Sequence, residues 1–221
     1  MNTRLLCIDS DIFAILAVAK RLDRAAELLG FLPASLRRLP ALEHMLARQS
    51  SFAQFDQVQK STILSAAQKI PPFTDSPTSK SVHQKLSTTP GIDPGEATIF
   101  AVMTEQPILW VASGDSRCMK SLCANANLAD VRNAVASRTI CLEAVIYLLI
   151  QADGYPETAA ALSCVRGHRT VRCLFPDNVS CKPDLPLEGV SSYLRSLCSE
   201  LGRGFLHCPP CPNSHQGTCT I

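Results

Sequence analysis

The sequence predicts an α/β fold in which helices surround a central, mainly parallel sheet. Short apolar runs at residues 4–8, 108–112 and 138–141 have the composition of buried parallel strands. Longer stretches with helical periodicity separate these runs. Strands that alternate with helices are typical of parallel sheets. Several helices fall between the first two strands, so we expect a largely helical insertion there.

The helices are predicted from apolar periodicity and from capping residues. We expect the first to begin at Ser10 or Asp11 and to end before Gly30. Pro40 suits the first turn of the second helix, and the Pro-, Ser- and Thr-rich residues 71–92 predict a loop with one helical turn near 82–86. The full set of expected helices is 10–29, 36–46, 52–64, 94–105, 116–124, 128–136, a helix directly after 138–141, 156–165 and 187–201.

The composition favours a cytoplasmic protein without a membrane segment. Of the 221 residues, 46% are hydrophobic, which is enough for a sizeable core, and the net charge of +2 gives no overall basic field for nucleic acid. Asp9 and Asp11 interrupt the apolar N-terminal stretch, which excludes a signal peptide. Eleven cysteines, an odd number, indicate mostly free thiols.

The composition shifts toward Cys, Pro and Arg beyond residue 166. We therefore expect a main domain at 1–165 and an extension at 166–221 that is partly helical and ends in a flexible Cys-rich tail. A zinc site is the alternative for this tail, but it runs to the chain end and its later gaps are short for a zinc knuckle. Its candidate ligands are His207, Cys208, Cys211, His215 and Cys219.

Three carboxylates lie at the ends of predicted apolar strands or at the start of an apolar helix. Asp9 ends the run LLCI, Glu96 opens the apolar helix GEATIFAVM, and Asp115 follows the run ILWVAS. Carboxylates at the carboxyl ends of parallel strands face the crevice where open α/β sheets bind ligands. Three that converge would repel one another, raise each other's pKa and favour a divalent cation.

These motifs resemble those of PIN-domain nucleases. IDSDIFAIL is similar to the opening motif of that family, GEATIFA to its central Gly-Glu-Ala helix start, and SGDSRCMKSL to its third motif, over about residues 1–145. The resemblance implies a three-layer fold and a ribonuclease that uses Mg²⁺ or Mn²⁺, with RNA as partner. It assigns metal binding and catalysis to Asp9, Glu96 and Asp115.

Three further residues have supporting roles under this resemblance. Ser113 could orient the site by hydrogen bonding, and Arg117 could bind a substrate phosphate. Asp11 could support the metal ligands without binding the metal itself. The sequence also departs from the family, because Ser10–Asp11 replaces the usual Thr–Asn pair and no carboxylate follows the third motif until Asp130. The sequence therefore lacks the family's fourth carboxylate at its usual place, and Asp11 and Glu143 are the alternatives for a second metal position.

Each carboxylate also has a purely structural alternative. Asp93 and Glu96 have the spacing of a capping box, Asp115 suits a turn, and Asp9 could cap the first helix. A basic run, VRGHRTVR, could contact phosphate but is equally compatible with a solvated surface; its charged members are Arg166, His168, Arg169 and Arg172.

Other functions stay open at this level. A haloacid-dehalogenase-type phosphatase would use Asp9-Ser10-Asp11 and Ser113-Gly114-Asp115, but would leave Glu96 without a role. A non-catalytic PIN-like module would bind RNA or protein. The sequence does not decide whether an antitoxin-like partner or a homodimer exists.

Overall fold

Four parallel strands form the centre of the molecule, in the order β2-β1-β3-β4. The computed structural model describes residues 4–48, 52–175 and 184–207. Its strands are β1 (Leu5–Ile8), β2 (Leu36–Arg38), β3 (Leu109–Ser113) and β4 (Thr139–Cys141), and each adjacent pair is parallel. The predicted α/β fold with a parallel sheet is therefore confirmed.

The two central strands are apolar and buried, as parallel strands covered on both faces must be. β1 and β3 pair in a register that sets Cys7 opposite Val111 and Ile8 opposite Ala112. The carboxyl ends of these strands therefore lie side by side, which brings together the residues that follow them.

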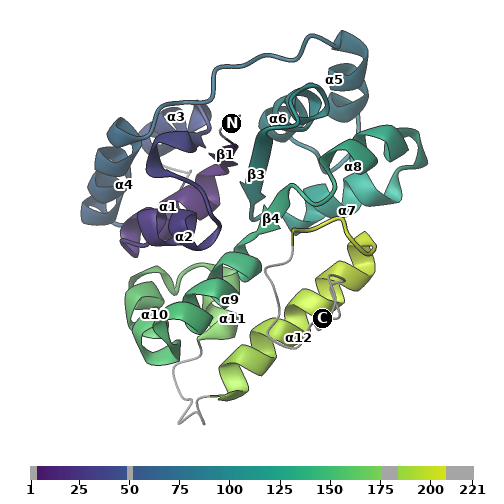
Figure 1. Cartoon of the computed structure of the whole chain (residues 1–221). Helices are drawn as coiled ribbons and strands as arrows, with labels where there is room; N and C mark the ends of the chain where they lie inside the picture. The colour runs from purple at the N-terminus through teal and green to yellow at the C-terminus, as the bar shows by residue number, and fades with distance from the viewer. Residues whose placement is uncertain (1–3, 49–51, 176–183, 208–221) are drawn as a thin grey trace.

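Helices flank the strands on both sides in Figure 1, with the later helices below them. The group on the left of the view comprises α1 (Ser10–Val18), α2 (Leu22–Leu28), α3 (Ala41–Ala47) and α4 (Gln57–Lys69). The group on the right comprises α5 (Lys80–Ser87), α6 (Pro94–Glu105), α7 (Ser116–Ala124) and α8 (Ala129–Val135). The lower group comprises α9 (Leu142–Asp153), α10 (Tyr155–Leu162), α11 (Arg169–Leu174) and α12 (Asp184–Leu201). Three 3₁₀ turns join them: η1 (Pro33–Ser35), η2 (Ala126–Leu128) and η3 (Ser163–Val165).

Three expectations for residues 10–69 were wrong, one of them being the helix expected at 52–64, which is α4 and runs over Gln57–Lys69. The single helix expected up to Gly30 is two helices, because Lys20 adopts a left-handed conformation with φ 55° and ends the first one. Residues 36–38, expected in a helix, form strand β2 instead, and the helix starts only at Ala41, after Pro40. Tertiary pairing with β1 decides this short segment, since Leu36 and Arg38 are buried.

The chain beyond residue 70 follows the prediction more closely. α6 and α7 have the expected bounds, and β3 and β4 lie within one residue of theirs. The loop expected at 71–92 contains the two-turn helix α5, and α11 was not predicted. No helix in the described part of the chain is long and apolar enough to cross a membrane.

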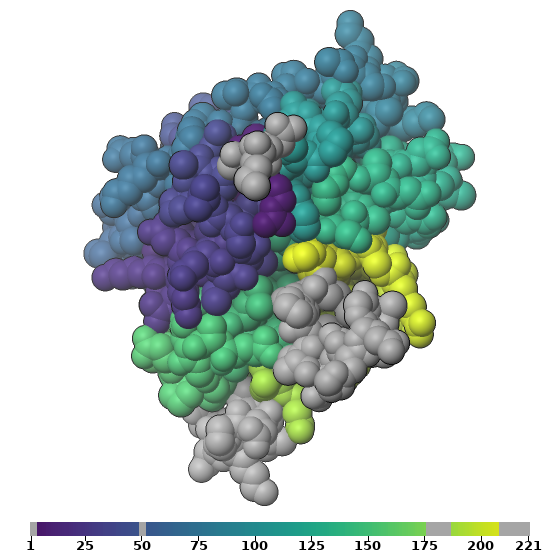
Figure 2. Space-filling view, in the orientation of Figure 1, coloured from purple at the N-terminus to yellow at the C-terminus, as the bar shows by residue number. Residues whose placement is uncertain are grey.

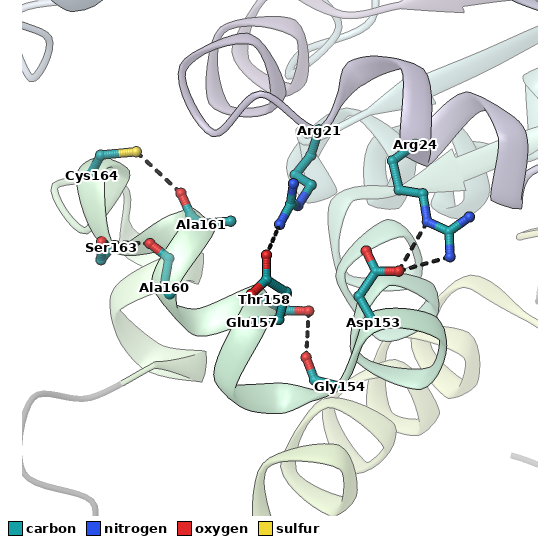
Figure 3. Close-up of polar contacts among 10 residues, drawn as sticks. All are labelled: Arg21, Arg24, Asp153, Gly154, Glu157, Thr158, Ala160, Ala161, Ser163 and Cys164. Carbon is teal, nitrogen blue, oxygen red and sulfur yellow. Dashed lines mark hydrogen bonds and ion pairs between the residues drawn. The ribbon is translucent and has the colours of Figure 1, made fainter.

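The later helices pack onto the earlier part of the chain. α12 lies against α9 and α7, and in Figure 2 the yellow residues near 200–207 lie directly against the teal surface. Two ion pairs join α2 to α9 and α10 (Figure 3). Arg21, which precedes α2, pairs with Glu157 of α10 at 2.6 Å, and Arg24 of α2 pairs with Asp153 of α9 at 2.7 Å. The buried apolar residues of both parts form one continuous core.

Candidate functional site

The candidate site lies where β1 and β3 end side by side. From β1 the chain crosses to β2 on one side of the sheet, and from β3 it crosses to β4 on the other. The strand order therefore reverses between β1 and β3, and ligands of open α/β sheets bind at such a switch point. The backbone amide of Asp9 donates to the carbonyl of Ala112 at 2.9 Å, which fixes Asp9 at this edge.

Asp9 caps the first helix from the end of β1. Its Oδ1 accepts the backbone amide of Ser10 at 2.7 Å, and the amide of Gly114 also hydrogen-bonds to this carboxylate. Burial raises the pKa of Asp9 to about 7, and the neighbouring charge of Asp11 adds to this effect. The carboxylate therefore titrates near neutral pH, and a cation beside it would stabilise its ionised form.

Glu96 is buried at the third position of α6, with 7% of its surface exposed. Its Oε2 accepts the amide of Asp93 at 3.0 Å, and Asp93 Oδ1 accepts the amide of Glu96 at 2.8 Å. The predicted capping box is therefore present. Burial raises the pKa of Glu96 to about 7, although the amide of Asp93 and the thiol of Cys118 hydrogen-bond to its carboxylate.

Asp9 and Glu96 line one small cavity, together with Ser113 of β3. Leu39, Ile99, Phe100 and Val111 supply its apolar walls. The cavity volume is about 10 Å³, and a single water needs roughly that much. The space between the two carboxylates thus admits one water at most, and any larger group must bind at the solvent side.

Asp115 differs from the other two carboxylates because its charge is already compensated. Its Oδ1 caps α7 by accepting the amides of Arg117 at 2.8 Å and Cys118 at 3.3 Å. The Arg117 guanidinium pairs with Oδ2 at 2.9 Å from a side chain that is 85% exposed. Burial alone would raise the pKa of Asp115, but these hydrogen bonds from Arg117 and Cys118 hold it below its usual range.

The other residues considered for the site from the sequence are Ser113, Asp11 and Glu143. Ser113 is buried, and its Oγ accepts the amide of Asp115 at 3.2 Å, so it supports the turn into α7. Asp11 is exposed in the first turn of α1, whose other residues are buried. Partial burial raises the pKa of Asp11, with His168 acting to lower it and Asp115 to raise it. Glu143 is buried in the first turn of α9, directly after β4, where it hydrogen-bonds with Cys141 and Thr170.

Sequence reasoning missed two contributors to this site. The thiol of Cys118 donates a hydrogen bond to the carboxylate of Glu96. Cys118 comes three residues after Asp115, and that helical spacing could have indicated that the two side chains lie on the same side of α7. His168 lies near enough to Asp11 for each to shift the other's pKa. Nothing in the local sequence could have linked residue 168 to residue 11, because their proximity depends on the fold.

The carboxylates lie at the same edge of the sheet and influence one another's pKa, but they do not form a complete set of metal ligands. Glu96 feels the charges of Asp93 and Asp115, and Asp9 feels those of Asp11 and Asp93. Among residues 4–48, 52–175 and 184–207, no three His, Cys, Asp or Glu side chains are arranged so that they could hold a metal ion directly. Instead, Asp9, Glu96 and Asp115 each hydrogen-bond to the start of a helix. Most of the suggested zinc ligands, from Cys208 to Cys219, lie outside the described residues.

The site contains carboxylate oxygens that could bind a cation, and the exposed guanidinium of Arg117 lies beside them. Hard divalent cations choose such ligands, and Mg²⁺ commonly takes one or two carboxylates and completes its shell with water. Comparison of the chain with protein-family models, with curated proteins and with solved structures gave no match.

Proposed function

We propose that this chain is a PIN-like, metal-dependent endoribonuclease that hydrolyses RNA phosphodiester bonds. The observation that carries the proposal is the pair Asp9 and Glu96, which line one cavity at the switch point of the sheet and both have a pKa raised to about 7. Two buried carboxylates of this kind are stabilised by a cation more than by any neutral ligand. The order and spacing of the three acidic motifs support the same reading.

The donor set fits Mg²⁺ or Mn²⁺ held partly through water. Asp9 and Glu96 would supply the anionic oxygens, and Asp115 would contribute charge at longer range. A bound divalent cation supplies activation of water and neutralisation of charge on the phosphate. The chain itself places the exposed Arg117 beside these carboxylates, where its guanidinium can bind a phosphate oxygen of the RNA.

The place of Glu96 argues against the phosphatase alternative. In that chemistry Glu96 would have no task, yet it lines the same cavity as Asp9. The non-catalytic module is the stronger second candidate, and it is favoured by the missing closed cage among the described side chains.

The deciding experiment compares RNA cleavage by matched variants. Purified protein is incubated with a structured RNA and increasing Mn²⁺ or Mg²⁺, with chelator in a parallel series. We expect metal-dependent internal cleavage that Asp9→Asn reduces by roughly a hundredfold or more. Asp130→Asn is the control, because Asp130 is exposed in the first turn of α8. RNA binding without cleavage at any metal concentration would favour the non-catalytic module.

A further inference from the structure

The exposed face of α4 carries almost no charge, and the proposed chemistry does not use it. The helix packs against α1 and α3, buries Ile63 and Ala67, and lies at the left edge of the molecule in Figures 1 and 2. Its exposed residues recur at helical spacing and are Gln57, Val58, Ser61, Leu64, Ser65, Gln68 and Lys69. Only the last of these is charged, whereas the solvent face of a surface helix ordinarily carries many charged residues.

Two apolar side chains project from this face, and a hollow lies beside each. Val58 is 76% exposed and Leu64 is 42% exposed. Val58 borders the larger hollow, of about 700 Å³, which α4 forms with the end of α1 and the start of α2. Leu64 borders the smaller hollow, of about 490 Å³, which α4 forms with α3. Gln57 and Ser61 line both, so one surface holds projecting apolar groups and recesses on either side of them.

Charged residues surround this face instead of lying at its centre. Lys20 and Asp23 border the larger hollow, and Arg48 and Lys60 border the smaller one. Protein interfaces have the same distribution, with charge depleted at the centre and polar groups at the rim. The size is also suitable, because 13 residues line the larger hollow and 8 the smaller, two of them shared. A stable interface takes about 20 to 30 residues on each side.

The charges at the two ends of α4 favour a second copy of this chain as the occupant. Asp56 caps the amino end of the helix, and Lys69 lies in its last turn. Neither has an ion-pair partner among residues 4–48, 52–175 and 184–207. When two copies of α4 lie antiparallel, Asp56 of each copy meets Lys69 of the other, and the helix dipoles attract as well. A parallel arrangement would bring like charges together.

We propose that the chain forms a symmetric dimer in which α4 packs antiparallel against α4 of a second copy. Such a dimer needs a self-complementary surface, since both copies use the same residues. Ser61 and Ser65 lie at the middle of the exposed face, where small side chains let two helices approach closely. The two-fold axis sets each hollow opposite its own counterpart, so Val58 of one copy faces the larger hollow of the other. The proposal does not depend on nuclease activity.

The oligomeric state of the purified full-length chain tests this proposal. Sedimentation equilibrium gives the mass as a function of concentration, and a reducing buffer prevents linkage through the exposed thiols of Cys164 and Cys173. We expect twice the mass of one chain, with a Kd of about 1 μM or lower, as interfaces of standard size give. A chain that is still monomeric at about a hundred times that concentration leaves the face to another occupant and overturns the proposal.

Leu64→Glu tests the centre of the face. Leu64 is partly exposed in the single chain, so the fold should tolerate the change, but the dimer would bury an unpaired charge. We expect the Kd to rise at least about thirtyfold. Leu32→Glu is the matched control, because Leu32 is 66% exposed and lines neither hollow, and it should leave the Kd unchanged. Thermal melts check folding, and Val58→Glu replaces Leu64→Glu if that variant is unfolded. A folded variant that dimerises like the parent contradicts the proposed interface.

Lys69→Glu and Asp56→Asn test the antiparallel arrangement. Lys69→Glu sets a carboxylate against Asp56 of the other copy and should raise the Kd about tenfold. Asn caps a helix as well as Asp does, so adding Asp56→Asn keeps α4 intact and should recover most of the lost affinity. Within one chain the two residues are separated by a helix of 13 residues, about 20 Å long, which is beyond the range of screened charges. Recovery therefore supports contact between copies, and a dimer without recovery overturns the antiparallel pairing.

Discussion

Asp93 and Glu96 cap each other: the amide of each donates to the carboxylate of the other, at 3.0 Å and 2.8 Å. The carboxylate of Glu96 also lines the cavity that it shares with Asp9. Glu96 thus has a structural role that needs only an acceptor oxygen, and a proposed chemical role that needs a negative charge. A substitution that keeps the oxygen and removes the charge separates the two.

Glu96→Gln makes this separation. The Gln side-chain oxygen can still accept the amide of Asp93, so the free energy of unfolding should change by well under about 1 kcal/mol. Metal-dependent cleavage of RNA should fall by roughly a hundredfold or more, because an anionic ligand is lost. Thermal melts and cleavage rates in Mn²⁺ measure the two effects. Cleavage at the parental rate would leave Glu96 as a cap alone and remove the central residue of the nuclease proposal.

Asp93→Ala should give the opposite result. It removes the acceptor for the amide of Glu96, and loss of such a cap costs about 1 kcal/mol. Asp93 is exposed and is absent from the cavity lining, so cleavage should stay within a few-fold of the parent. The same melts and rates serve here. If this variant lost activity as steeply as Glu96→Gln, helix geometry rather than charge would explain both.

The raised pKa values of Asp9 and Glu96 predict that stability declines toward alkaline pH. Both values are about 7 in the folded protein, against 3.8 and 4.5 as ordinary values. The folded state therefore holds protons that the unfolded state has released between about pH 4 and pH 7. Stability is fully present below this window and is lost as pH rises through it, by on the order of 3 to 4 kcal/mol per carboxylate.

Denaturant unfolding at about pH 5 and about pH 8 measures this decline. The lowered pKa values of His168 and His207 act in the opposite direction, so the informative quantity is the difference between parent and variant. Glu96→Gln should be relatively more stable at the higher pH, and added Mg²⁺ should recover part of the loss in the parent. Parallel pH dependences of parent and variant would contradict the raised pKa.

Asp115 should tolerate Asn but not Ala in its capping role. Asn is as good a cap as Asp, so Asp115→Asn should change stability by less than about 0.5 kcal/mol, whereas Asp115→Ala should cost about 1 kcal/mol. Since Arg117 already neutralises Asp115, loss of its charge should reduce cleavage less than loss of Glu96 does. Chemical denaturation and cleavage assays of the two variants check this order. Equal loss in Asp115→Asn and Glu96→Gln would place Asp115 among the direct ligands.

The sequence predicted those parts of the structure in which local signals and tertiary packing agree. α6 begins at Pro94 behind the cap Asp93 and follows its apolar period, and its bounds were predicted correctly. β2 was missed because three residues carry no period, and only pairing with β1 makes them a strand. Lys20 gave no breaker signal, although its left-handed backbone ends α1.

The sequence likewise predicted some features of the candidate site and could not predict others. The sequence placed Asp9 and Asp115 after adjacent strands, and the sheet confirms that β1 and β3 are neighbours. It also predicted the capping box of Glu96. It could not show that all three carboxylates are engaged in capping, or that His168 approaches Asp11, because these depend on side-chain geometry across distant segments.

The end of the chain offers a test of which residues belong to the fold. From the sequence alone, truncation after Arg203 should be harmless. The structure gives a reason to move that boundary, because residues 204–207 join the edge of β4. The carbonyl of Phe205 accepts the amide of Ser137 at 2.8 Å, and the amide of His207 donates to Thr139 at 2.8 Å. Phe205 and Leu206 are both buried.

Truncation after Arg203 should therefore destabilise the protein, by roughly 3 kcal/mol or more for two buried apolar side chains. Truncation after His207 keeps these contacts and should leave both the melting temperature and any cleavage activity unchanged. Thermal melts of the two shortened chains beside the full chain measure the difference. Strong destabilisation by the shorter deletion, with zinc retained through purification and unfolding on chelation, would instead show that the cysteines beyond residue 207 hold a structural metal.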